Sequence, residues 1–164
     1  MIEELESLFL ICPDCFLEGE IKKQFGSYCY FLTALGAVFT LQAFEYAEEI
    51  NNFIIRENIK RNYVVNDTSC IQIREALNEY PSWKSDSERV LRMLKLKHRS
   101  AFKTLPDLIE CKKKLAELNI KEQASQLLEF PFVGLKISNN QIGLSGLIYD
   151  RKTRKFSHVP ISYY

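Results

Sequence analysis

The chain of 164 residues is 46% hydrophobic and 12% aromatic, which supplies enough apolar material for one buried core and excludes a disordered chain. Its 22 basic and 21 acidic residues leave a formal charge of +1, so no global positive field exists to attract nucleic acid or an anionic membrane. The odd number of cysteines, the acidic N-terminus and the lack of a long apolar run argue against a secreted disulfide scaffold, a signal peptide and a membrane span. We therefore expect a single domain over residues 1–164, located in a reducing cytoplasm.

Short apolar runs alternate with longer amphipathic segments in the first half of the chain, a pattern typical of α/β proteins. The apolar run 7–11 predicts a strand that is buried on both faces and ends at a proline. Residues 28–32 predict a second strand, residues 37–58 a long helix and residues 63–65 a third strand. A strand, a helix and a strand in this order predict a right-handed parallel crossover.

The second half of the chain is expected to be mainly helical before it returns to strands. Residues 69–80 and the lysine-rich region 83–129 have helical patterns. The apolar segments 133–137 and 142–149, separated by an asparagine turn, predict a hairpin, and residues 156–161 predict an edge strand. The complete pattern predicts one α/β domain.

The residues best suited to chemistry follow the first and third predicted strands. The sequence Cys-Pro-Asp-Cys occupies residues 12–15, and Asn-Asp-Thr-Ser-Cys occupies residues 66–70. Because ligands bind at the carboxyl ends of parallel strands, we expect these thiols and carboxylates to converge in one crevice. The alternative is that Cys12 and Cys70 are small buried apolar residues, as free cysteines often are. Phosphate-binding glycine loops and a serine nucleophile elbow are absent from the sequence.

These segments resemble the metal-site motifs of the β-class carbonic anhydrases. Cys12 and Asp14 match the first two named positions of the family's Cys-x-Asp-x-Arg motif, and the segment from Asp67 to Cys70 aligns with its His-x-x-Cys motif. Residues 144–153, Leu-Ser-Gly-Leu-Ile-Tyr-Asp-Arg-Lys-Thr, are similar to the family's His-Gly-x-x-Tyr-Asp-x-x-Thr-Gly hairpin.

The resemblance extends over residues 7–160 and implies a β-carbonic-anhydrase-like α/β fold. Such a fold has a central, mostly parallel sheet flanked by helices, with a C-terminal antiparallel hairpin. By the same resemblance, Cys12, Asp67 and Cys70 are the expected ligands of a zinc ion, and Asp14 is the expected catalytic residue.

The departures from the family pattern fall on the chemistry. Asp67 replaces the zinc-binding histidine, and Phe16 replaces the arginine that partners the catalytic aspartate. Zinc with two thiolates and a neutral imidazole is a neutral site that lowers the pKa of bound water to about 7. A carboxylate in place of the imidazole makes the site negative, so that water holds its proton more tightly. Asp14, without its arginine, could also close the fourth position. We therefore predict a pseudoenzyme without efficient CO2 hydration, in which zinc is retained or lost.

Two other functions compete with this interpretation. The first is an active zinc-dependent carbonate dehydratase, or a related zinc lyase or hydrolase, that uses Cys12, Asp67 and Cys70 as ligands. The second is a thiol redox protein in which Cys12 and Cys15 form a reversible disulfide. Against the redox function, nothing else in the sequence resembles a thioredoxin, and Asp14 beside the thiols would raise their pKa.

Bicarbonate or another small anion is the expected ligand, and a second copy of the chain is the expected partner. The related family dimerises through sheet edges and through an N-terminal arm, which we expect to be missing or cut away here, because the sequence begins close to its first predicted strand. We still expect a homodimer, because the aromatic residues of the second strand would otherwise form an unusual exposed patch. Nucleic acid and membranes are not expected partners.

Overall fold

The structure is a computed structural model that describes residues 4–39, 41, 43–82 and 84–162. Its centre is a five-stranded sheet with the strand order β2-β1-β3-β4-β5. The strands are β1 (Ser7–Ile11), β2 (Cys29–Thr33), β3 (Arg61–Asp67), β4 (Gly143–Asp150) and β5 (Lys155–Val159). Strands β1 to β4 run parallel to one another, and β5 runs antiparallel to β4. This arrangement confirms the predicted α/β fold with a mostly parallel sheet and a C-terminal antiparallel pair.

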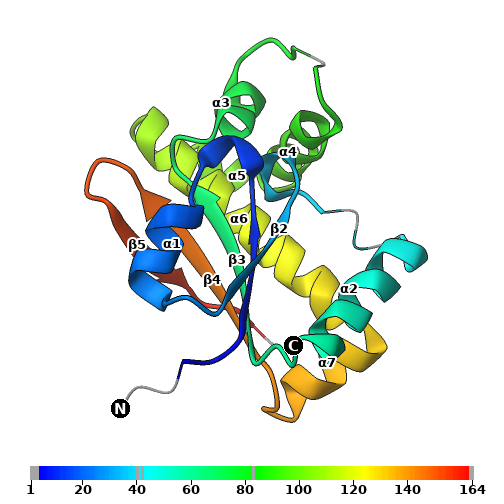
Figure 1. Ribbon diagram of the computed structural model, residues 1–164. Helices are drawn as coiled ribbons and strands as arrows, with labels where there is room; N and C mark the ends of the chain where they lie inside the picture. The colour runs from blue at the N-terminus through cyan, green and yellow to red at the C-terminus, as the bar shows by residue number, and fades with distance from the viewer. Residues whose placement is uncertain (1–3, 40, 42, 83, 163–164) are drawn as a thin grey trace.

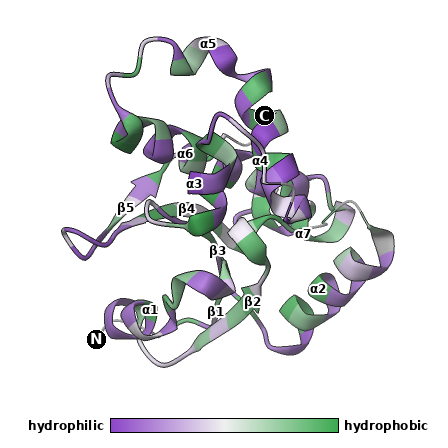
Figure 2. Ribbon diagram, turned by 90° about the horizontal axis from the view of Figure 1, so that it is seen from above, coloured by the Kyte–Doolittle hydropathy of each residue, from purple (hydrophilic) through white to green (hydrophobic). Residues whose placement is uncertain are grey.

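Helices cover both faces of the sheet. Figure 2 shows α1 on one side of the sheet and α2, α6 and α7 on the other, and Figure 1 shows α6 crossing the sheet diagonally. The helices are α1 (Glu18–Phe25), α2 (Phe44–Arg56), α3 (Ile71–Leu77), α4 (Asp86–Lys97), α5 (Arg99–Phe102), α6 (Leu108–Leu128) and α7 (Pro131–Ser138), with the 3-10 turns η1 (Pro13–Cys15) and η2 (Leu35–Ala37). Among the described residues, none of these helices is both long enough and apolar enough to cross a membrane.

The central strand β1 is buried over its full length, as its continuous apolar run predicts. Leu8 and Leu10 belong to the core that the sheet forms with α2, α6 and α7. Phe9 points to the opposite face, where it stacks on Tyr63 with ring centroids 4.7 Å apart and contacts Phe25 of α1 at 5.2 Å. The alternation along β1 therefore fills two cores and fixes the position of the carboxyl end of the strand.

The predicted hairpin over residues 133–149 is wrong in its first half. Residues 131–138 form the helix α7, with Pro131 in its first turn, where the missing N–H of proline costs no hydrogen bond. An apolar run of this length suits a buried helix as well as a strand, because hydrophobicity alone does not separate the two. The antiparallel pair is instead β4 with β5, joined by a turn over residues 151–154.

Two other predicted elements differ in extent. Among the described residues of the predicted helix 37–58, the α-helix α2 extends only over Phe44–Arg56, and Ala37 belongs to η2. The third strand is longer than predicted, because β3 pairs with β4 as far as Asp67 opposite Tyr149. The longer strand carries Asp67 to the carboxyl end of the sheet.

Candidate metal centre

Two short turns bring cysteines together at the carboxyl end of the sheet. The first is η1, which begins after β1 and in which the N–H of Cys15 donates to the carbonyl of Cys12 at 3.2 Å. A 3-10 turn has three residues per turn, so Cys12 and Cys15 lie on the same side of it. The second follows β3, where the N–H of Cys70 donates to the carbonyl of Asp67 at 3.1 Å and α3 begins.

The sulfur atoms of Cys12, Cys15 and Cys70 all lie within 4.8 Å of one another. The three residues are only 1%, 3% and 1% exposed, respectively, and none forms a disulfide. Tetrahedral zinc binds thiolates at about 2.3 Å, which places the sulfur atoms about 3.8 Å apart. The three sulfurs therefore fit a thiophilic metal ion such as zinc. We call these three residues the sulfur cluster.

Hydrogen bonds make the three thiols inequivalent. Side-chain hydrogen bonds from Cys15 and Cys70, together with the backbone N–H of Gly36 at 3.2 Å, hold the pKa of Cys12 far below its usual range despite its burial. The same hydrogen bonds to Cys12 raise the pKa of Cys15 and of Cys70. Cys12 is therefore the thiol whose ionised form its neighbours favour.

The carboxylate of Asp67 lies at the same end of the sheet but is not part of the sulfur cluster. Asp67 is fully buried, and its Oδ1 accepts a hydrogen bond from the N–H of Ser69 at 2.7 Å. Its Oδ2 lies 2.6 Å from Nε of Arg151, which also donates through Nη2 to the carbonyl oxygen of Cys15. Burial raises the pKa of Asp67, whereas the Ser69 N–H and Arg151 oppose that rise.

The side chains at the positions of the family's catalytic aspartate and of its partner arginine, Asp14 and Phe16, take no part in this arrangement. Asp14 is exposed, and its carboxylate makes no hydrogen bond or ion pair with any residue in the described part of the chain. Phe16 is 78% exposed and adopts a left-handed backbone conformation, with φ of 52°. A catalytic role for Asp14 stays a prediction.

A buried polar network borders the sulfur cluster. Asn119 of α6 donates through Nδ2 to Asn66 Oδ1 at 2.9 Å and to the carbonyl of Gly36 at 3.1 Å. Asn66 also donates to the Gly36 carbonyl at 3.1 Å, and Gln123 Oε1 accepts from the N–H of Phe39 at 3.0 Å. These contacts fix the backbone of Gly36 and Phe39, and the N–H of Gly36 donates to the sulfur of Cys12.

Cys12 and Cys70 lie in one cluster, as their positions after two parallel strands predict, whereas Cys15 was not predicted as a third sulfur donor. The signal was present, because cysteines three positions apart face the same way in a 3-10 turn. Arg151 was also missed. It lies 84 positions from Asp67, and no local pattern indicates that the turn after β4 reaches the end of β3.

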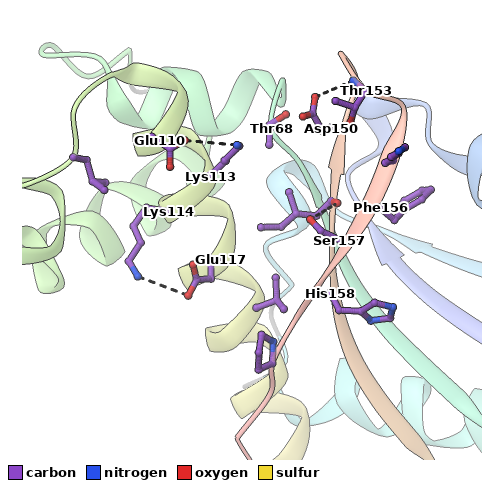
Figure 3. Close-up of a pocket in the computed structure, with 15 residues that line it drawn as sticks. Thr68, Glu110, Lys113, Lys114, Glu117, Asp150, Thr153, Phe156, Ser157 and His158 are labelled. Carbon is purple, nitrogen blue, oxygen red and sulfur yellow. Dashed lines mark hydrogen bonds and ion pairs between the residues drawn. The ribbon is translucent and has the colours of Figure 1, made fainter.

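The groove between α6 and the β4–β5 pair has a different character (Figure 3). It has a volume of about 470 Å³. Its charged residues of α6 pair with one another, Lys113 with Glu110 at 3.6 Å and Lys114 with Glu117 at 3.7 Å. No cysteine lines it, and its mixed charges favour no particular ligand.

Comparison with known proteins identifies the fold. No protein-family model matches the chain, and no curated protein sequence matches it. Among solved structures, the β-carbonic anhydrase CafA of the fungal pathogen Aspergillus fumigatus superposes with a TM-score of 0.82 at 21% identity, covering 98% of this chain and 77% of that one. A structure of tetrameric β-carbonic anhydrases from Sordaria macrospora also gives 0.82, at 14% identity and with 96% and 81% of the two chains covered. The Coccomyxa β-carbonic anhydrase in complex with acetazolamide gives 0.74 at 15% identity, covering 96% of this chain and 72% of that one. The chain therefore has the β-carbonic anhydrase fold.

Proposed function

We propose that this protein binds zinc through Cys12, Cys15 and Cys70 and does not hydrate CO2 efficiently. The observation that carries the proposal is the sulfur cluster, in which three buried sulfur atoms lie within 4.8 Å of one another. Three buried thiols that converge in this way are a donor set suited to a soft or borderline metal ion. Neither Cys29 nor Cys111 belongs to the cluster.

The residues around the cluster support a site of low catalytic power. Three thiolates leave a zinc site with a net charge of −1, which weakens the Lewis acidity that zinc supplies when bound. The Asp67 carboxylate pairs with Arg151 and accepts a hydrogen bond from the N–H of Ser69. Asp14 is exposed, and no arginine among the described residues pairs with it. The exposed Phe16 can neither orient a carboxylate nor donate a hydrogen bond to an anion.

Stopped-flow measurement of CO2 hydration by the purified, zinc-loaded protein tests this proposal. We expect the catalysed rate to be at least about a thousandfold below that of an active β-carbonic anhydrase measured at the same protein concentration. A rate within about tenfold of the active enzyme would contradict the proposal. It would instead favour an active carbonate dehydratase, or a related zinc lyase or hydrolase, with Cys12, Asp67 and Cys70 as ligands.

A thiol redox function is the second candidate, because the same proximity of Cys12 and Cys15 suits disulfide formation. Metal binding and disulfide formation exclude each other, since both consume the same sulfur atoms. Mass spectrometry after mild oxidation and after reduction distinguishes them. The proposal predicts that zinc protects both thiols from oxidation, whereas a reversible Cys12–Cys15 disulfide in the zinc-loaded protein would favour redox chemistry.

We also propose that the protein acts in the cytoplasm as a homodimer and that its ligand is bicarbonate or another small anion. β2 lies at the edge of the sheet, and its aromatic residues Tyr30 and Phe31 are only half-buried. An edge strand of this kind is suited to pairing with a second copy. Sedimentation equilibrium should give twice the chain mass of 19.2 kDa. A monomer at micromolar concentration would contradict the dimer.

A further inference from the structure

We infer that Arg151 is a positioning residue that selects the metal donor set, by keeping the Asp67 carboxylate away from the metal and the Cys15 sulfur beside it. This inference rests on the proposed metal-binding function. It assigns Arg151, which lies outside the cysteine motifs, a specific task. It also explains why Asp67, the residue that stands at the position of a metal ligand, lies outside the sulfur cluster.

The geometry of Arg151 connects the two competing donors. Arg151 begins the turn between β4 and β5, which lies at the same end of the sheet as η1 (Figure 1). Its Nε is 2.6 Å from Asp67 Oδ2, at the end of β3, and its Nη2 donates to the carbonyl oxygen of Cys15, in η1. One guanidinium group therefore holds a carboxylate and the backbone of a cysteine at the same time, which its planar fork of donors allows.

The ion pair with Arg151 offsets the cost of burying the Asp67 carboxylate. Asp67 is fully buried, and an unpaired buried carboxylate is strongly unfavourable. Arg151 is the only cation that forms an ion pair with Asp67 among the residues that the structure describes. Without Arg151, a metal ion bound by the sulfur cluster would supply the positive charge that the carboxylate has lost.

Loss of Arg151 would also release the Cys15 segment. Three thiolates and one carboxylate around a divalent ion carry a net charge of −2, which a buried site without a nearby cation does not tolerate well. One anion must then give way. We expect it to be Cys15, because its backbone loses the hydrogen bond from Arg151. The donor set would change from three thiolates to Cys12, Cys70 and Asp67.

Cobalt substitution measures this change without relying on activity. The intensity of sulfur-to-cobalt charge-transfer absorption per bound Co²⁺ follows the number of thiolates bound. Arg151→Gln should therefore lower this absorbance by about one third relative to the wild type, as the donor set changes from three thiolates to two. Arg154→Gln is the matched control, because Arg154 lies in the same turn but pairs with Glu20 at 3.0 Å. It should leave the absorbance unchanged.

The double variant Arg151→Gln/Asp67→Asn separates the carboxylate from a general loss of structure. We expect it to recover the wild-type absorbance, because a neutral amide competes poorly for the metal. Arg151→Lys and Asp67→Asn should each keep three thiolates. These two variants also test the inference if Arg151→Gln does not fold, which circular dichroism would show.

The cobalt measurements distinguish failure of the inference from failure of the proposed function. Wild-type protein that binds no Co²⁺ or Zn²⁺ would overturn the proposed function, and the inference with it. Three thiolates in both the wild type and Arg151→Gln would overturn the inference and leave the proposed function intact. A double variant that stays at two thiolates would also overturn it, because the change would then not act through Asp67. Loss of metal from Asp67→Asn would show that Asp67 is itself a ligand, contrary to the inference.

Discussion

The backbone N–H of Gly36 donates a hydrogen bond to the sulfur of Cys12 across 3.2 Å. Gly36 lies in η2, and its carbonyl accepts hydrogen bonds from the buried side chains of Asn66 and Asn119, each at 3.1 Å. The N–H of Gly36 therefore binds the sulfur cluster, and its carbonyl binds side chains of β3 and α6. This segment couples the packing of α6 to the geometry of the proposed metal site.

The backbone conformation of Gly36 makes this segment sensitive to substitution. Gly36 has φ of +67°, and a Cβ added there would lie 3.1 Å from Gln72 Cβ and 3.3 Å from Leu91 Cδ1. Gly36→Ala should therefore lower the free energy of unfolding by about 1–3 kcal/mol, through backbone strain and crowding. Urea denaturation of the metal-free protein measures this change.

Gly19→Ala is the matched control for that substitution. Gly19 lies in α1 with nothing within 4 Å of its added Cβ, so alanine should stabilise the protein by about 0.5–1 kcal/mol. Equal effects of the two substitutions would contradict the role assigned to the Gly36 conformation.

The amide of Asn119 is expected to contribute to stability through its buried partners. It is fully buried, and Asn119→Leu would remove a donor from the carbonyls of Gly36 and Ala37 and from Asn66 Oδ1. The Gly36 carbonyl keeps its hydrogen bond from Asn66, but the acceptors on Ala37 and Asn66 lose theirs, which should lower the free energy of unfolding by about 1–3 kcal/mol. Asn52→Leu, at an exposed position of α2, should change it by less than about 0.5 kcal/mol. A neutral Asn119→Leu would show that the network does not stabilise the fold.

The ionised side chain of Glu88 predicts how stability depends on pH. Hydrogen bonds from Ser82, together with Arg92 at 3.0 Å, lower the pKa of this buried carboxyl from 4.5 to about 2. Because the folded state favours the ionised form, the stability that Glu88 contributes is complete above pH 4.5 and is lost as the pH falls towards 2. The wild type should therefore lose more thermal stability than Glu88→Gln over this range.

Thermal unfolding from pH 5 to pH 2 measures this difference, with exposed Glu48→Gln as the control. The melting temperatures of the wild type and Glu48→Gln should fall in parallel, and the gap between the wild type and Glu88→Gln should narrow. A gap that stays constant down to pH 2 would show that Glu88 is not ionised preferentially in the folded protein.

Local pattern predicted the strands better than the helices. The run 7–11 coincides with β1 because continuous apolar residues suit a central strand that is covered on both faces. The apolar stripe from Val38 onward predicted a helix that begins too early. The segment before α2 instead turns through η2, where Gly36 has a positive φ and hydrogen bonds hold the chain to β3 and α6. These are long-range contacts that hydrophobic periodicity does not report.

In the candidate site, too, local pattern predicted some residues, and long-range contacts that it does not report determine the others. Cys12 and Cys70 could be placed together because both follow strands of a predicted parallel sheet. Arg151 could not be paired with Asp67, because that contact depends on the pairing of β4 with β3 and on the turn that follows β4. The family resemblance predicts that Asp67 is a metal ligand. The structure gives its carboxylate an ion pair instead, and the assignment of its role stays a prediction.

Metal content tests the central claim most directly. Elemental analysis of protein purified without chelators should find about one zinc ion per chain in the wild type and in Cys111→Ser, whose cysteine lies outside the sulfur cluster. Cys15→Ser should retain much less zinc, because it loses one of three thiolates. Wild-type protein without metal, or Cys15→Ser with a full complement of zinc, would contradict a metal site built on Cys12, Cys15 and Cys70.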